Sequence, residues 1–164
     1  MYCKISQLKH LIVTVIISVC FAGCSPINLY EKTVVIPSQA WYYNYVPSFS
    51  FNISDTAAAY NIYIVLRHTD SYQYNNIWLR LGTKAPGGTE NSQNLDLALG
   101  SDTKGWEGQG MDDIFEVRKI ITRGAVPFKK AGTYTFTVSQ IMRENPLKHI
   151  LNVGIRVEKT FEQQ

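Results

Sequence analysis

The first residues whose types are suited to chemistry are His68 and Asp70, in the segment Arg67-His68-Thr69-Asp70. A histidine near an aspartate can form half of an acid–base pair. However, no serine or cysteine nucleophile stands in a recognisable setting, and hairpin turns favour Asp, Ser and Asn on their own account. The segment therefore favours a structural role, and we expect no enzyme activity.

A second candidate is a loop expected from Gly100 to Asp113, which is rich in glycine and in acids (Asp102, Glu107, Asp112 and Asp113). Carboxylates can gather a Ca²⁺ ion, which takes oxygen ligands, but their spacing here fits no EF-hand. In the alternative interpretation, Trp106 packs down as a loop anchor and the surrounding glycines allow turns with positive φ. We favour this alternative and expect neither a metal nor a cofactor.

The third candidate is an unusual concentration of aromatic side chains, at Trp41, Tyr42, Tyr43 and Tyr45 and again at Tyr72, Tyr74 and Trp78. Exposed aromatic rings stack on sugars or act as hot spots for protein partners. The three tyrosines of the first group cannot all face one side of a strand, so that group is the better candidate for exposure. The predicted interaction surface is Trp41, Tyr42, Tyr43, Tyr45 and Trp106.

The N-terminal segment has the pattern of a bacterial lipoprotein signal. Lys4 and Lys9 precede an apolar stretch from Leu11 to Ala22, which has the length of a signal-peptide core and is too short for a membrane span. The small residues before Cys24 resemble a lipobox, although Phe21 stands where leucine is more common. We expect residues 1–23 to be a signal peptide and Cys24 to carry lipid; the alternative is an ordinary secretory signal with an incidental cysteine.

Removal of this signal changes the charge and the cysteine content of the chain. The full chain has 16 basic and 13 acidic residues, and the signal removes Lys4 and Lys9, so a formal charge near +1 remains. Nothing here indicates a nucleic-acid partner. Cys3 and Cys20 leave with the signal, so no disulfide, zinc site or thiol nucleophile is expected.

The remainder predicts a short lipidated tether at 24–30 and a single domain at 31–164. Runs of β-branched and aromatic residues alternate with polar ones and are broken by Gly, Pro, Asn and Asp. About eight strands are expected, near 33–36, 49–53, 60–67, 76–81, 95–99, 114–122, 133–141 and 152–160. A longer mobile loop is expected at 84–94. This pattern predicts an all-β antiparallel sandwich, either jelly-roll or immunoglobulin-like.

Several segments together resemble the GldH-type gliding-motility lipoproteins of Bacteroidota. The similarity extends from Cys24 to about Lys159. It rests on Cys24-Ser-Pro-Ile-Asn-Leu-Tyr-Glu-Lys, the Trp41 segment, Tyr60-Asn-Ile-Tyr, Arg67-His-Thr-Asp, Tyr74-Asn-Asn-Ile-Trp-Leu, Gly105-Trp-Glu-Gly-Gln-Gly-Met-Asp-Asp-Ile and Asn152-Val-Gly-Ile-Arg-Val-Glu-Lys.

The resemblance implies an accessory lipoprotein of a gliding-motility or associated envelope secretion apparatus. It implies membrane attachment through Cys24, an envelope protein complex as partner, and no catalytic residues. Ser25 after Cys24 suits the outer membrane, and the absence of an acidic run after Cys24 favours a periplasm-facing domain. A glycan-binding envelope module remains the alternative function.

Overall fold

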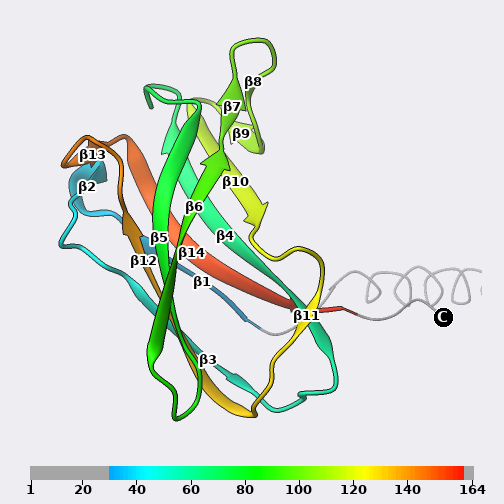
Figure 1. The fold of residues 1–164 in the computed structure, drawn as a ribbon. Helices are drawn as coiled ribbons and strands as arrows, with labels where there is room; N and C mark the ends of the chain where they lie inside the picture. Colours follow the sequence, from blue (N-terminus) through cyan, green and yellow to red (C-terminus); the bar gives the residue numbers. More distant parts are fainter. Residues whose placement is uncertain (1–29, 161–164) are drawn as a thin grey trace, which may run out of the picture.

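The computed structural model describes residues 30–160, in which strands are the predominant elements (Figure 1). Within this range eight strands have six or more residues, and they correspond to the eight strands expected from the sequence. They are β1 (Tyr30–Val35), β3 (Ser48–Ile53), β4 (Ala59–Thr69), β5 (Asn76–Lys84), β6 (Glu90–Ala98), β10 (Ile114–Ile120), β12 (Gly132–Gln140) and β14 (Ile150–Lys159). The predicted signal peptide and Cys24 lie outside the described residues.

Shorter elements connect these strands and bring the number of strands above eight. They are the 3-10 turn η1 (Pro37–Gln39), β2 (Ala40–Trp41), β7 (Gly100–Ser101), β8 (Gly105–Trp106), β9 (Gln109–Met111), β11 (Val126–Pro127) and β13 (Leu147–Lys148). In the described range no helix is long and apolar enough to cross a membrane.

The long strands form two antiparallel sheets, which confirms the predicted fold class. One sheet has the order β1-β14-β4-β10-β9, with β11 also pairing with β4, and the other has the order β3-β12-β5-β6. In Figure 1, β5, β6 and β12 cross in front of β4 and β14. As the sequence predicts, β4 is a central strand, because β14 and β10 flank it.

The core lies between the two sheets and follows the alternation seen in the sequence. Strands β4, β5, β12 and β14 each contribute alternate side chains, which are buried, to one apolar cluster. These residues are Ile62, Ile64 and Leu66 of β4, Ile77, Leu79 and Leu81 of β5, Tyr134, Phe136 and Val138 of β12, and Val153, Ile155 and Val157 of β14. This burial supplies the main stabilisation of the domain.

The segment 84–94 differs from its prediction as a long loop. Strand β5 continues to Lys84 and β6 begins at Glu90, so only five residues form the connection. The first five residues of β6 are all exposed. A strand with both faces in water at a sheet edge has no apolar alternation, so its sequence resembles that of a loop.

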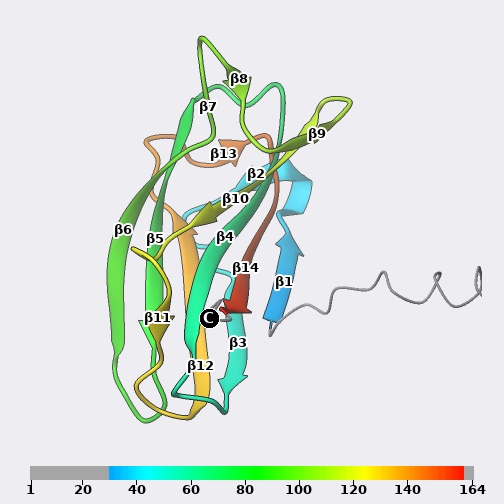
Figure 2. The same ribbon diagram turned by 90° about the vertical axis from the view of Figure 1, so that its right-hand side faces the viewer.

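Both ends of the described chain lie at one end of the sandwich. Tyr30 pairs with Val157 near the end of β14. From there β1 leads to the other end, where β2 pairs with β13. The views in Figures 1 and 2 agree on this arrangement. An anchor before Tyr30 would therefore attach at the end of the domain opposite β2 and β13.

Candidate functional site

Two residues of the first aromatic group depart from the expected exposure: Tyr45 is only partly exposed and packs against the core, and Trp41 is buried. Its side chain is 0% exposed, and its indole Nε1 donates to the carbonyl of Tyr45 at 2.8 Å. Strand β2 pairs Trp41 with Leu147 of β13, so the ring packs into the core. Trp41 therefore supports the surface from beneath and offers no contact to a partner.

Tyr42 and Tyr43, which directly follow β2, are exposed by 50% and 45%. Tyr43 is fixed to the segment after β12. Its backbone N–H donates to Asn145 Oδ1 at 2.9 Å, and its hydroxyl donates to the carbonyl of Met142 at 2.7 Å. Because both its backbone and its hydroxyl are already fixed, the exposed ring of Tyr43 would lose little conformational entropy when a partner binds, which favours affinity.

Trp78 comes to the same region from β5. Ile77 and Leu79 on either side point into the core, so the alternation of the strand turns Trp78 outward, where it is 42% exposed. Its backbone N–H contacts the sulfur of Met142 at 3.1 Å, and its carbonyl accepts from the N–H of Ile141 at 2.9 Å. Met142 therefore lies between Trp78 and Tyr43.

Two adjoining hollows surround Met142. One, of about 700 Å³, is lined by Tyr74, Trp78, Ile141, Met142 and Arg143. The other, of about 310 Å³, is lined by Tyr43, Arg80, Ser139, Gln140, Ile141 and Met142. We call Tyr42, Tyr43, Tyr74, Trp78 and Met142 the aromatic surface. It is rimmed by two arginines and lies at the end of the sandwich away from Tyr30.

The buried side chain of Gln140 holds this surface together. Its Nε2 donates to the carbonyls of Trp41 and Glu144, each at 3.1 Å, and its Oε1 accepts from the N–H of Met142 at 2.8 Å. Only 1% of this residue is exposed. One amide thus provides hydrogen-bond partners for three backbone groups, the carbonyl of Trp41 in β2 and two groups in the turn from β12 to β13.

Sequence reasoning named the tyrosines and Trp78 but missed Gln140, Ile141, Met142 and the two arginines. Met142 is 64 residues from Trp78 and 99 from Tyr43. Nothing local to the sequence signals that the three come together. The sequence does contain one signal for this turn: Gln140 occupies the next inward-facing position after Tyr134, Phe136 and Val138, where an apolar residue is expected.

The structure gives no support to an acid–base pair at His68. The ring is 0% exposed, and its Nδ1 lies 2.8 Å from the carbonyl of Thr69, which can only accept. Nδ1 is therefore the protonated nitrogen, and Nε2 has no partner among the described residues. Burial lowers the pKa of His68, and the bond to Thr69 offsets this in part. Asp70 is exposed and bonds to Ser71 instead.

Trp106 packs against His68 with ring centroids 4.6 Å apart, and Tyr72 and Phe115 complete the aromatic cluster. It is only partly exposed. This arrangement matches the loop-anchor interpretation, and the segment from Gly100 to Asp113 contains the three short strands β7, β8 and β9. An interaction role for Trp106 stays a prediction.

The acids of this segment do not assemble a cation site. Asp102 accepts from Asn75 Nδ2 at 2.7 Å, and Glu107 pairs with Lys119. Between residues 30 and 160 no three His, Cys, Asp or Glu side chains stand close enough together to hold a metal ion. The geometry of these acids therefore does not support the Ca²⁺ hypothesis.

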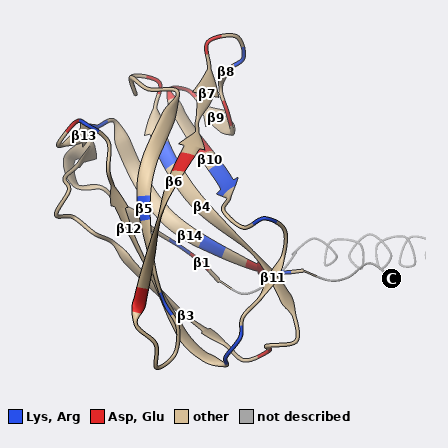
Figure 3. Cartoon of the chain, viewed as in Figure 1, with Lys and Arg blue, Asp and Glu red and all other residues tan. Residues whose placement is uncertain are grey.

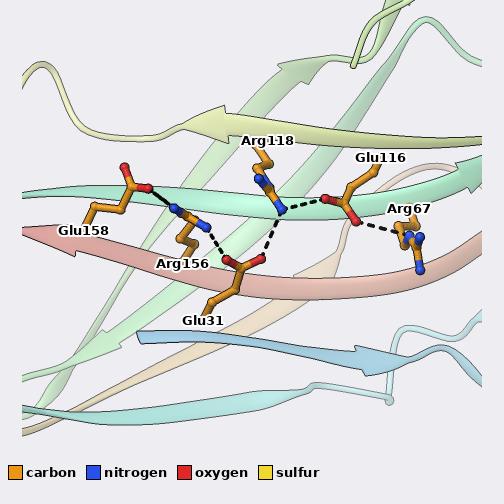
Figure 4. Close-up of polar contacts among 6 residues, drawn as sticks. All are labelled: Glu31, Arg67, Glu116, Arg118, Arg156 and Glu158. Atoms are coloured by element: carbon orange, nitrogen blue, oxygen red, sulfur yellow. Dashed lines mark hydrogen bonds and ion pairs between the residues drawn. The ribbon is translucent and has the colours of Figure 1, made fainter. Parts of the chain in front are cut away.

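Six charged side chains form a ladder across the six-stranded sheet (Figure 4). In order they are Glu158, Arg156, Glu31, Arg118, Glu116 and Arg67. Arg118 contacts Glu31 at 3.4 Å and Glu116 at 2.9 Å; Arg67 contacts Glu116 at 3.2 Å; Arg156 pairs with Glu31 and Glu158. The signs alternate and cancel, so the ladder offers no net charge to a ligand.

Charges elsewhere are also mixed along the chain rather than separated into blocks (Figure 3). The aromatic surface is accordingly the candidate site that the structure supports best. It is suited to binding, since it places flat rings, a flexible thioether and two guanidinium groups at the surface.

Comparisons with known proteins agree with the sequence resemblance. A family described as GldH lipoprotein matches residues 28–157. The gliding motility lipoprotein GldH homolog of Christiangramia forsetii is 27% identical over 147 residues, covering 85% of this chain and 89% of that protein. The gliding motility lipoprotein GldH of Flavobacterium johnsoniae is 24% identical over 160 residues, covering 93% and 98%.

Two solved structures have a partial likeness. One is TmCBM61 in complex with β-1,4-galactotriose, with a TM-score of 0.33, 12% identity and coverage of 79% of this chain and 88% of that chain. The other is the infectious bursal disease virus VP2 subviral particle, with a TM-score of 0.32, 13% identity and coverage of 82% and 33%. Both TM-scores are too low to support any inference.

Proposed function

The chain belongs to the GldH lipoprotein family, and from that premise we propose that it is a membrane-anchored accessory component of a gliding-motility or associated envelope secretion apparatus. The relatives are named as gliding motility lipoproteins, which supports a non-catalytic role. His68, the best candidate for acid–base chemistry, is buried and has no carboxylate partner.

Lipid on Cys24 would attach this domain to the periplasmic face of the outer membrane. Cys24 precedes Tyr30 by six residues, so the tether can span at most about 20 Å. With so short a tether, the end of the sandwich at Tyr30 stays near the membrane. The aromatic surface at the other end then faces away from the lipid, towards proteins that stand in the envelope.

The single observation that carries this proposal is the construction of the aromatic surface. Exposed aromatic rings normally remain mobile, but Tyr43 is bonded at both its N–H and its hydroxyl. Trp78 is fixed through its backbone to the same turn. Pre-ordered aromatic residues with neighbouring arginines are the composition of protein-binding hot spots. We therefore place the contact with the partner complex here.

The test is photo-crosslinking in cells of the native host. A photoreactive phenylalanine analogue replaces Tyr43 in one strain and the exposed Ser50 of β3 in another. We expect the Tyr43 position to capture one envelope protein that the Ser50 position does not. Equal capture from both positions, or none from Tyr43, would contradict a docking role for the surface.

A glycan-binding role is the second candidate, and one observation favours it. The hollow of about 700 Å³ places Tyr74 and Trp78 beside Arg143, a combination that can stack on a sugar ring and donate to its hydroxyls. Titration with cell-wall and polysaccharide fragments, followed by tryptophan fluorescence, separates the two roles. A saturable change in tryptophan fluorescence that Trp78→Ala abolishes would favour glycan binding. An unchanged fluorescence would favour a protein partner.

A further inference from the structure

Strand β6 is a long sheet edge that no other part of the described chain covers. It ends the order β3-β12-β5-β6, and its nine residues pair only with β5. Figure 2 shows it along the outer side of the molecule. The edge strands β1, β3 and β9 have six, six and three residues. Long open edges usually carry charged side chains, above all lysine, or a proline or bulge that prevents pairing. Strand β6 contains no proline or lysine, its charges are confined to Glu90 and Asp96, and it pairs in unbroken register.

An apolar hollow of about 310 Å³ opens beside this edge. Gln93 of β6 lines it together with apolar side chains from both sheets, among them Ile62, Leu81, Ile121, Phe128 and Phe136. Ala85, at the start of the turn before β6, is also part of the lining. A strand added along β6 would turn every second side chain to the same side as Gln93. One such side chain could enter the hollow.

The charges of β6 indicate which occupant fits. Its only charged residues are Glu90, the first residue of the strand, and Asp96, two residues before its end; Figure 3 accordingly shows red on this strand. A second copy paired on this edge would bring together four carboxylates and no cation, which is unfavourable for facing strands. A foreign strand with lysine or arginine near its ends and an apolar residue between them would match both features.

We propose that β6 is a β-augmentation site, at which an extended segment of the partner protein adds a fifth strand to the sheet and places an apolar side chain in the hollow. In such complexes main-chain hydrogen bonds supply affinity, and pockets for alternate side chains supply specificity. The inference rests on the proposed function, because the partner is the protein that docks on the aromatic surface. The two sites adjoin: Trp78 is paired with Asp96, and Arg80 Nε donates to Asn94 Oδ1 at 3.3 Å.

The test places the photoreactive analogue at Asn94 in the full-length chain in cells, with Asn52 as the matched control on the opposite edge strand β3. Both asparagines are exposed. We expect Asn94 to capture the same protein as Tyr43 and Asn52 to capture none. Capture from Tyr43 without capture from Asn94 overturns the edge inference and leaves the proposed function. Capture from Asn94 alone contradicts the role of the aromatic surface and, with it, the shared partner on which this inference rests.

A second variant tests the hollow itself. Ala85→Trp fills it without changing β6, and Ala57→Trp, at an exposed position in the turn after β3, is the control. We expect Ala85→Trp to reduce the Asn94 adduct by about tenfold or more, as when an apolar anchor is excluded from its pocket. Circular dichroism should show both variants folded. An undiminished adduct in a folded Ala85→Trp chain would contradict the anchor.

Discussion

Replacing Gln140 with methionine should lower the free energy of unfolding by about 3 kcal/mol. Methionine keeps the length of the side chain and loses its donors and acceptor. The three backbone groups that Gln140 contacts, the carbonyls of Trp41 and Glu144 and the N–H of Met142, then lose these hydrogen bonds. Each such bond contributes about 1 kcal/mol net, and a buried group left alone costs about as much or more.

Urea unfolding of the unlipidated chain, followed by tryptophan fluorescence, measures this change. Gln109→Met is the matched control, because Gln109 is exposed on β9, and it should change stability by no more than about 0.5 kcal/mol. Thermal melting should show a fall of roughly 10 °C for the Gln140 variant alone. A loss below about 1 kcal/mol would mean that water replaces the amide, and would refute Gln140 as the support of the aromatic surface.

Four other outcomes are expected. Phe136→Ala should cost about 3–5 kcal/mol in denaturant unfolding, since Phe136 is 3% exposed; a loss near zero would place it outside the core. Burial lowers the pKa of His68 below its ordinary 6.5, so the imidazole binds a proton more readily in the unfolded chain, and the free energy of unfolding should fall as the pH drops below about 6.5. His68→Phe should reduce this pH dependence, and an unchanged pH dependence would exclude His68 as its source. Arg118→Met should cost at most about 1 kcal/mol, a difference that about 1 M salt removes; a larger loss that resists salt would contradict a surface role. Cys24→Ser should abolish fatty-acid labelling and leave the precursor uncleaved, whereas surviving labelling would place the lipid elsewhere.

The sequence predicted the strands whose two faces differ. In β5 and β12 an apolar residue alternates with a polar one because one face packs and the other meets water. The same rule missed the first half of β6, where both faces meet water. It also misplaced Trp41, because β2 has two residues and is buried through pairing with Leu147, more than a hundred residues away.

The aromatic surface could be predicted only in pieces. Tyr43 and Trp78 have recognisable side chains, but their adjacency depends on Met142, which β12 and β13 bring between them. Contacts of this kind follow from sheet order, and periodicity does not determine sheet order. The interval from Ser139 to Lys148 even has the weak pattern of a helix, which Pro146 interrupts.

The position of Glu31 has a mechanical consequence. Glu31 is the second residue of β1, one residue after the point where a lipid tether would pull on the folded domain, and Arg156 and Arg118 clamp it to two other strands. A force between the tether and a partner at the far end of the sandwich runs along β1. The backbone bonds between β1 and β14 would then bear the load together in shear, rather than opening one at a time. If the tether carries lipid at Cys24, this arrangement would let the domain resist tension from the membrane without losing its first strand.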